Sequence, residues 1–299
     1  MAIAEANGIS ICYESLGSDA DPALLLVMGF TAQLTAWNDG FCQLLVDAGF
    51  RVIRFDNRDC GLSTHLDGVT VDLPAVLKAW ETDGPMPPVP YAMRDFAADA
   101  IGLLDHLDIE QAHIVGASMG GMIVQQMAIE YPTRVASMTS IMSTTGEREF
   151  YQWDPATRAA MSTPPPTDRA GYVAHSVELA RYLCGAFYDA ERSAARASAS
   201  YDRAFYPEGA ARQTAAIRAG GNRADGLRSV DTPTLVIHGR EDSLIQPIGG
   251  ERTAELIGNA NLLVLAGMGH DLPPVLWPLI TSAIASNCRR AASTGQTIP

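Results

Sequence analysis

Short apolar runs alternate with longer amphipathic segments along most of the chain. Apolar runs of strand length and apolar residues at helical spacing are the primary sequence signals of secondary structure. They predict strands at 9–14, 23–28, 51–55, 112–115, 135–142, 234–238 and 261–265, and helices at 37–48, 92–107 and 120–131. Strands that alternate with helices form a mostly parallel sheet covered on both faces. We therefore expect an α/β fold, in which the first two strands pair as an antiparallel hairpin at the sheet edge.

Two segments interrupt this alternation. Residues 66–91 are rich in proline, which stops helices and sheets from propagating, so we expect an ordered loop with a short helix at 73–80. Residues 146–230 are rich in Ala and Arg, helical in period, and too long to be a structureless loop. This second segment predicts a helical cap, residues 146–230, inserted into a core domain made of residues 1–145 and 231–299.

Composition narrows the classes of function. Of the 299 residues, 47% are hydrophobic and 18% are charged, so the chain can bury a sizeable core. A net charge of −13 without a dense Lys/Arg cluster argues against binding to nucleic acid or to an anionic membrane surface. Five scattered cysteines without a CxxC pair, and a start without a secretory signal, predict a cytoplasmic protein that has neither a disulfide framework nor a zinc site.

The strongest motif is a Gly-x-Ser-x-Gly sequence that runs from Gly116 to Gly120. It follows the strand at 112–115 and precedes a helix, which is the context of a nucleophile elbow. In such a turn the Oγ atom of Ser118 is exposed, and the two glycines leave room for the backbone, where any Cβ would clash. The Met119 N–H then lies at a helix N-terminus, where negative charge is favoured. The motif lacks both the GxGxxG spacing of a dinucleotide site and the Lys of a phosphate-binding loop.

With this elbow, the chain resembles the serine-nucleophile α/β-hydrolases over nearly its whole length. The other matching segments are 26–30 (Leu-Val-Met-Gly-Phe), 52–63 and 266–273 (Ala-Gly-Met-Gly-His-Asp-Leu-Pro). Within that superfamily it resembles the bacterial esterases grouped with aclacinomycin methylesterase and the cofactor-free haloperoxidase-like hydrolases. The resemblance implies an eight-stranded, mostly parallel sheet with an inserted helical cap, and a catalytic triad in the chain order Ser, acid, His.

The resemblance places the acid of the triad just after the strand at 234–238. Asp242 occupies that position, and Glu241 is the neighbouring competitor, whose side chain should point away. Of the six histidines, His270 alone follows a strand and a Gly-Met-Gly turn, so it is the predicted base. The other five are interpreted as structural, solvated or lid residues; they are His65, His106, His113, His175 and His238.

Two backbone N–H groups are predicted to form the oxyanion hole. One is the N–H of Met119, and the other is the N–H of Phe30, in the loop that follows the strand at 23–28. Related hydrolases often have His-Gly where this chain has Met28-Gly29. Because Phe30 and Met119 are apolar and adjoin the nucleophile, we also expect them to contact an apolar substrate.

The segment 56–63 resembles the D-x-R-G-x-G-x-S run of the family. Asp59 replaces the usual first glycine, and we interpret the run as structural, with Asp56 and Arg58 bracing the loops below the oxyanion hole. Cys60 has no partner in the run that would activate its thiol, so a catalytic role is not predicted.

These residues predict a serine-dependent carboxylic ester hydrolase that acts on a small to medium apolar ester through an acyl-enzyme, without metal or cofactor. The resemblance adds a methyl ester of a polyketide-like acid as a candidate substrate. The same triad would also serve a perhydrolase, a cofactor-free haloperoxidase or a carbon–carbon bond hydrolase. From another class, a non-catalytic protein that binds a ligand on this fold is the remaining alternative. The oligomeric state cannot be read from the sequence.

Overall fold

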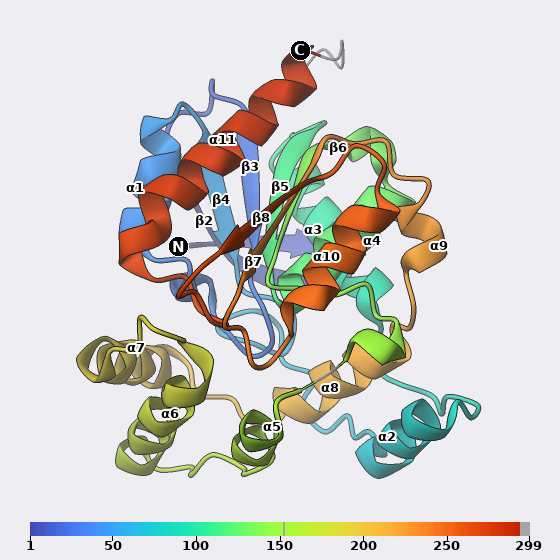
Figure 1. The fold of residues 1–299 in the computed structure, drawn as a ribbon, viewed down its shortest axis with the longest axis vertical. Coiled ribbons are helices and arrows are strands. Elements are labelled where there is room, and N and C mark those ends of the chain that lie inside the picture. The colour runs from blue at the N-terminus through green and yellow to red at the C-terminus, as the bar shows by residue number, and fades with distance from the viewer. Residues whose placement is uncertain (152, 294–299) are drawn as a thin grey trace.

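The computed structural model describes residues 1–151 and 153–293, and its centre is an eight-stranded sheet (Figure 1). The strand order is β1-β2-β4-β3-β5-β6-β7-β8, and every pair from β4 onward is parallel. The predicted α/β fold with a mostly parallel sheet is confirmed. The strands are β1 (Ala2–Ala6), β2 (Ile9–Leu16), β3 (Ala23–Val27), β4 (Arg51–Phe55), β5 (Ala112–Ala117), β6 (Val135–Ile141), β7 (Thr234–Gly239) and β8 (Asn261–Leu265).

The predicted antiparallel hairpin between the first two predicted strands is wrong. β2 pairs with β1 and β4, whereas β3 lies between β4 and β5. All five residues of β3 are buried, as expected for an interior strand with both faces covered. The true hairpin turns at Asn7 and Gly8, both at positive φ (48° and 77°), and an Asn-Gly pair is a strong hairpin signal.

Helices cover both faces of the sheet (Figure 1). α1 (Asp39–Asp47) and α11 (Trp277–Ser293) pack on one face, and α3 (Met93–His106), α4 (Met119–Glu130) and α10 (Pro247–Leu256) pack on the other. Because successive side chains of a strand point to opposite faces, Leu24 and Leu26 pack in the cluster that contains α1, while Leu25 and Val27 pack in the cluster that contains α3. Short 3-10 helices lie at Leu34–Ala36, Pro132–Arg134, Arg148–Phe150 and Pro274–Leu276.

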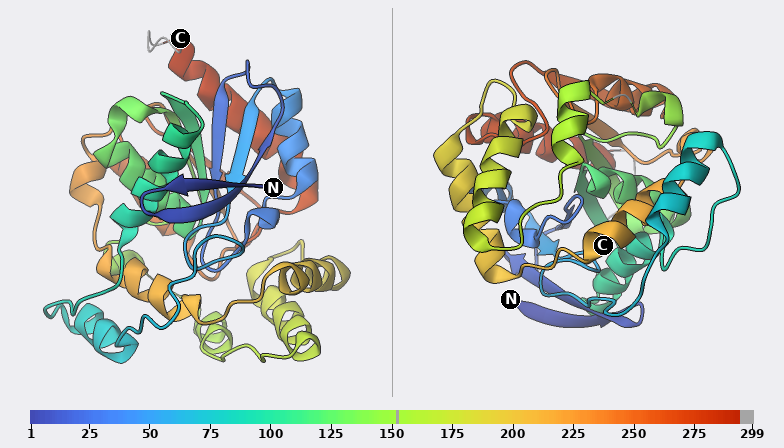
Figure 2. Two further views of the ribbon diagram at one scale, coloured as in Figure 1. Left: turned by 180° about the vertical axis from the view of Figure 1, so that it is seen from behind. Right: turned by 90° about the horizontal axis from the view of Figure 1, so that it is seen from below.

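The segment between β6 and β7 is helical and lies at one end of the sheet. It contains α5 (Pro155–Met161), α6 (Arg169–Leu183), α7 (Ala190–Arg203), α8 (Gly209–Ala219) and α9 (Ala224–Leu227). α6 lies beside α7, and α8 lies beside α2 (Leu73–Thr82), the short helix expected in the proline-rich segment (Figure 2). α9 packs Ala224 and Leu227 into the core. The cap boundaries at 146 and 230 stay predictions.

Residues 1–151 and 153–293 contain no helix that is long and apolar enough to cross a membrane.

The buried histidine of β5 should make stability depend on pH. Burial lowers the pKa of His113 from 6.5 to about 4, and its Nδ1 lies 2.8 Å from Ser137 Oγ. Between these values the unfolded chain binds the proton more readily, so the free energy of unfolding falls as the pH is lowered from about 6.5 towards 4. The contribution lost between pH 7 and pH 5 is about 2 kcal/mol. Urea unfolding at both pH values should show a smaller loss for His113→Asn; an equal loss in both proteins would contradict the assignment.

Candidate active site

Ser118 lies in the sharp turn between β5 and α4. Its backbone has φ 57° and ψ −119°, a conformation that a residue with a side chain rarely adopts. The Ser118 N–H donates to the Ile141 carbonyl (2.9 Å), and Ser143 Oγ–H donates to the Ser118 carbonyl (2.8 Å). These bonds from β6 and the loop after it hold the turn, so the strained serine projects its hydroxyl beyond the sheet.

Three glycines allow the backbone to approach this turn. A Cβ on Gly116 would lie 2.0 Å from the Gly120 carbonyl oxygen, and a Cβ on Gly120 would lie 2.0 Å from the Val27 carbonyl oxygen. A Cβ on Gly29, in the loop after β3, would come within 3.0 Å of Ser118 Cβ. The two motif glycines are therefore required by close packing, and Gly29 brings the loop after β3 against the serine.

The structure brings Ser118, His270 and Asp242 together from three separate loops. The Ser118 hydroxyl donates to His270 Nε2 (2.9 Å), and His270 Nδ1–H donates to Asp242 Oδ2 (2.8 Å). The other oxygen, Asp242 Oδ1, accepts from the N–H groups of Leu244 (3.0 Å) and Ile245 (2.9 Å). The result is a continuous line of hydrogen bonds from the serine hydroxyl to a carboxylate with a fixed orientation.

Asp242 is a buried carboxylate that stays ionised. Burial by itself would raise the pKa of Asp242, but the charge of His270 and hydrogen bonds from His238 and His270 lower it to about 2. The neighbouring Glu241 is exposed, and its Oε2 accepts from the Gly267 N–H (2.6 Å) instead. Of the two acids weighed from the sequence, Asp242 is therefore the one that contacts the imidazole.

A second histidine supports the same carboxylate. His238 is fully buried in β7, its Nε2–H donates to the Ile245 carbonyl (2.7 Å), and Nε2 lies 3.4 Å from Asp242 Oδ2. Sequence reasoning placed His238 in a strand as a structural residue and did not connect it to the acid. Its position four residues before Asp242 is the signal that could have linked the two.

Two backbone donors next to Ser118 have no acceptor. Within the described chain, neither the Phe30 N–H nor the Met119 N–H donates to a protein atom. The Phe30 loop is held by Asn57 Nδ2–H, which donates to the Met28 carbonyl (2.8 Å). The Met119 side chain is 1% exposed and packs in the core, whereas Phe30 is half-buried. Both N–H groups are thus free to bind an anion, and of the two side chains Phe30 is the more accessible.

The described residues hold no cluster of three or more His, Cys, Asp and Glu side chains that could bind a metal ion. All five cysteines are buried and free, and burial raises the pKa of Cys60 far above its ordinary value.

Comparison with known proteins agrees with the fold. The sequence profile of a family described as alpha/beta hydrolase fold matches residues 22–274.

The chain belongs to the α/β hydrolase fold family.

Two curated relatives match this α/β hydrolase over most of its length. It is 26% identical to a rhodomycin D methylesterase of Streptomyces peucetius, over 95% of this chain and 96% of the relative. It is 22% identical to a bifunctional esterase/perhydrolase of Acinetobacter calcoaceticus, over 89% of this chain and 91% of that protein. An esterase structure from Exiguobacterium antarcticum superposes with a TM-score of 0.74 over 96% of this chain and 99% of that chain, at 18% identity, which shows a shared fold.

The helical segment between β6 and β7, which is called the cap from here on, contacts the loops that carry the candidate active site. Gln213 Oε1 of α8 accepts from the Thr31 N–H (2.8 Å), next to Phe30. The Leu183 carbonyl at the end of α6 accepts from the His270 N–H (2.6 Å). Asp271 binds Arg192 (2.6 Å) and Arg196 (2.9 Å) of α7. No sequence motif predicted these contacts, because they join segments far apart in the chain.

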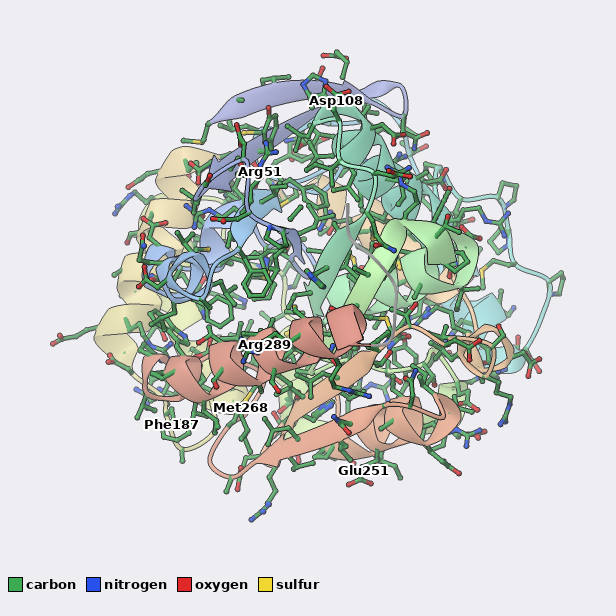
Figure 3. All side chains as sticks on the ribbon, turned by 90° about the horizontal axis from the view of Figure 1, so that it is seen from above. Arg51, Asp108, Phe187, Glu251, Met268 and Arg289 are labelled. Carbon is green, nitrogen blue, oxygen red and sulfur yellow. The ribbon has the colours of Figure 1, made fainter. Side chains whose placement is uncertain are left out.

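The connection between α6 and α7 packs closely on the loop that carries His270. Met268 forms an isolated β-bridge with Gly185, and Phe187 lies so close to Gly267 that a Cβ there would come within 2.9 Å of the Phe187 ring. Figure 3 shows Phe187 and Met268 as neighbours. The connection between α6 and α7 therefore sets the position of the loop that carries the imidazole.

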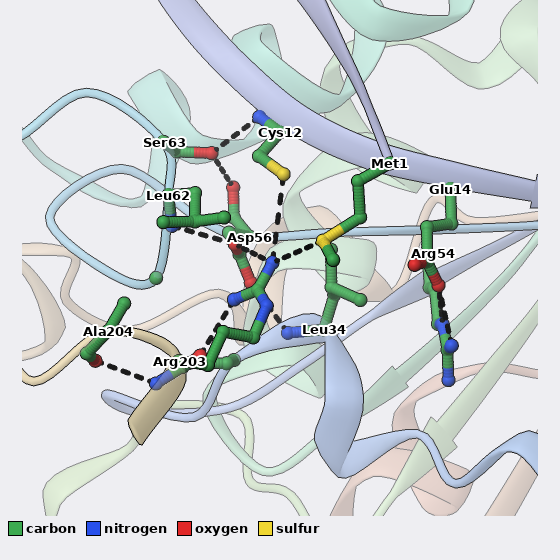
Figure 4. Close-up of polar contacts among 12 residues, drawn as sticks. Met1, Cys12, Glu14, Leu34, Arg54, Asp56, Leu62, Ser63, Arg203 and Ala204 are labelled. Atoms are coloured by element: carbon green, nitrogen blue, oxygen red, sulfur yellow. Dashed lines mark hydrogen bonds and ion pairs between the residues drawn. The ribbon is translucent and has the colours of Figure 1, made fainter. Parts of the chain in front are cut away.

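Asp56 braces the loop after β3, as predicted (Figure 4). Its buried carboxylate accepts from the N–H groups of Leu34 (2.7 Å) and Leu62 (2.8 Å), and Arg203 of α7 donates to it as well (2.8 Å). Arg58 points elsewhere, because its guanidinium makes two 2.6 Å bonds to Asp99 of α3. Arg58 therefore fixes a core helix rather than the loops near the oxyanion donors.

Asp59 anchors the cap. It has φ 60°, a conformation that Asp tolerates better than most residues, and its buried carboxylate accepts from Arg212 of α8 (2.7 and 2.8 Å) and from the Tyr91 hydroxyl (2.6 Å). The usual family glycine could adopt this φ but could not bind Arg212. The structural role expected for this run thus includes a bond between core and cap.

Removing the cap-side partner of Asp59 should destabilise the fold. Arg212→Met leaves a buried carboxylate without its cation, which costs about 3 kcal/mol in the free energy of unfolding. Urea denaturation at pH 7 measures this loss. The matched control is Arg169→Met, because Arg169 also pairs with an aspartate but both partners are half exposed. Equal losses in the two variants would contradict the anchoring role.

Proposed function

We propose that this α/β hydrolase is a serine-dependent carboxylic ester hydrolase. Ser118 is the nucleophile, His270 the general base and Asp242 the residue that orients the imidazole. The observation that carries the proposal is the line of hydrogen bonds from Ser118 Oγ through His270 to Asp242, at 2.9 and 2.8 Å. An ordered Ser-His-Asp array of this kind activates a hydroxyl for acyl transfer.

The geometry supports a two-step reaction. Ser118 Oγ attacks the ester carbonyl while His270 Nε2 takes the hydroxyl proton, and the imidazolium is stabilised by Asp242. The N–H groups of Phe30 and Met119 bind the oxyanion, which in comparable sites contributes about 10²–10³ in rate per donor. His270 returns the proton to the leaving alcohol, and an acyl-enzyme remains. Water, deprotonated by His270, then attacks the acyl carbon and releases the acid together with free Ser118.

The substrate we propose is a small to medium ester with an apolar body. Half-buried Phe30 offers an apolar surface beside the nucleophile. The relative named as a methylesterase supports a methyl ester of a polyketide-like acid as a candidate. A small molecule, rather than nucleic acid or a membrane, is the proposed partner, because the net charge is −13. The cytoplasmic location stays a prediction and agrees with five free cysteines.

A panel of p-nitrophenyl esters of increasing acyl length tests the proposal. Purified enzyme should release p-nitrophenol fastest from one chain length in the short to medium range. Parallel reactions with hydrogen peroxide and a carboxylic acid would reveal perhydrolase chemistry at the same triad. Binding of esters without turnover would instead support a ligand-binding protein and overturn the proposal.

A further inference from the structure

Arg218, near the end of α8, lies among three aromatic rings. Its guanidinium carbon is 4.2 Å from the centroid of Trp80, 4.8 Å from that of Tyr151 and 5.8 Å from that of Trp153. Trp80 belongs to α2, whereas the other two rings come from the segment after β6. The three rings form an aromatic cage around one cation, because the faces of such rings attract positive charge.

Among the described residues, the caged guanidinium lies within ion-pair distance of no carboxylate, although Glu81 acts on its charge from farther away. Its Nε and Nη1 atoms are completely enclosed and make no hydrogen bond, and Arg218 forms no ion pair within residues 1–151 and 153–293. Arg58, Arg203 and Arg212 each bind an aspartate, and buried Arg223 donates instead to Gln125 Oε1 and to the Thr144 carbonyl. Burial lowers the pKa of Arg218 and the charge of Arg158 acts in the same direction, whereas Tyr151 and Glu81 oppose them. A buried cation without a counter-charge is unfavourable, so this arrangement favours binding of an anion.

The cage adjoins the candidate active site. The Tyr151 hydroxyl lies 3.8 Å from Met122 Sδ, and Met122 is in the first turn of α4, which begins directly after Ser118. In α8, Gln213 holds the loop next to Phe30 and stands five residues before Arg218, which is about 7.5 Å along a helix. Phe30 and Tyr151 pack against the same hydrophobic cluster. Tyr151 and α8 thus connect the cage to the first turn of α4 and to the loop next to Phe30.

We propose that Arg218 and its aromatic cage bind a carboxylate group of the substrate, so that the preferred substrates are esters that carry a free carboxylate at a distance from the ester bond. This inference rests on the proposed ester hydrolysis. A guanidinium is planar and always charged, and Nη2 of Arg218, which is not one of the enclosed atoms, can donate to a carboxylate oxygen. The three rings exclude water from that contact and offer flat surfaces to an apolar or aromatic linker.

Matched pairs of methyl esters test the subsite. Monomethyl succinate, adipate and suberate carry a distal carboxylate, and methyl butyrate, hexanoate and octanoate are the neutral esters of the same length. The enzyme should show a higher kcat/KM for the half-ester of at least one pair. Arg218→Met should lower kcat/KM for that half-ester about tenfold or more, with little effect on the neutral ester. Arg169→Met, an exposed cap arginine, should leave the ratio unchanged.

A binding experiment separates this inference from the proposed function. Two of the cage rings are tryptophans, so titration of the Ser118→Ala protein with monomethyl adipate should change its tryptophan fluorescence, and Ser118→Ala/Arg218→Met should not respond. If no ester is hydrolysed but this response is seen, the hydrolase proposal fails and the subsite stands. If neutral and half-esters are hydrolysed equally, or if Arg218→Met lowers both rates alike, the carboxylate subsite is overturned.

Discussion

Ser118→Ala is expected to lower kcat for ester hydrolysis by about 10⁵- to 10⁶-fold, because loss of the nucleophile disables the whole triad. The residual rate would come from the N–H groups of Phe30 and Met119 and from substrate binding, neither of which needs the hydroxyl. The fold should persist, since the Ser118 N–H and carbonyl make their hydrogen bonds through the backbone. Release of p-nitrophenol from the best ester of the panel measures the effect.

Ser18→Ala is the matched control for this variant. Ser18 lies in the connection between β2 and β3 and is exposed, so its loss should leave kcat near the wild-type value. A circular dichroism spectrum and a thermal melt of Ser118→Ala verify that the fold is intact. Wild-type turnover by a folded Ser118→Ala protein would assign the hydrolysis to another residue.

Asp242→Asn should lower kcat by about 10⁴-fold through the orientation and tautomer of the imidazole. The carboxylate accepts from His270 Nδ1–H, whereas an amide nitrogen at that place would turn the histidine or reverse its tautomer, so that Nε2 could no longer take the serine proton. Because the pKa of Asp242 is about 2, the wild-type carboxylate stays charged throughout the range in which the enzyme can be assayed. The loss should therefore persist from pH 5 to pH 9 rather than appear at one end.

Glu241→Gln is the control for the acid. The amide oxygen of Gln can still accept from the Gly267 N–H, so the loop before His270 should keep its place and kcat should change little. A comparable loss of kcat in both variants would mean that catalysis depends on the negative charge of this turn and not on the contact between Asp242 and His270. A mild loss in Asp242→Asn alone would move the orienting role to another residue.

Seven of the eight strands and the helices α1, α3 and α4 could be predicted from local pattern, because each is a run of apolar residues or a repeat whose period is visible in the sequence; α10 and α11, which also cover the sheet, were not predicted. β1 was missed, because alanines fill its buried positions and give little contrast with the polar side. The predicted edge pairing is wrong because the connection between β2 and β3 is as rich in turn residues as a hairpin loop, whereas the real hairpin turns at the Asn7-Gly8 pair. Local sequence pattern does not determine which strands pair when they are far apart in the chain.

The candidate site likewise has a part that could be predicted from the sequence and a part that could not. Ser118, Asp242 and His270 each follow a strand in a recognisable turn, so their approach could be predicted from chain order and fold. The contacts from the cap could not. Arg212 at Asp59 and Gln213 at Thr31 join residues that lie more than a hundred positions apart, and nothing in the local sequence distinguishes these side chains from solvated ones.

Covalent labelling tests the assignment of Ser118 as the nucleophile, because the proposed hydrolysis depends on one activated serine. The protein should be incubated with a fluorophosphonate, which phosphonylates activated serine hydroxyls, and then digested and mapped by mass spectrometry. We predict stoichiometric labelling at Ser118, loss of ester hydrolysis in parallel with labelling, and no labelling of the Ser118→Ala protein. Labelling at another serine, or a fully active enzyme after complete labelling of Ser118, would contradict the account.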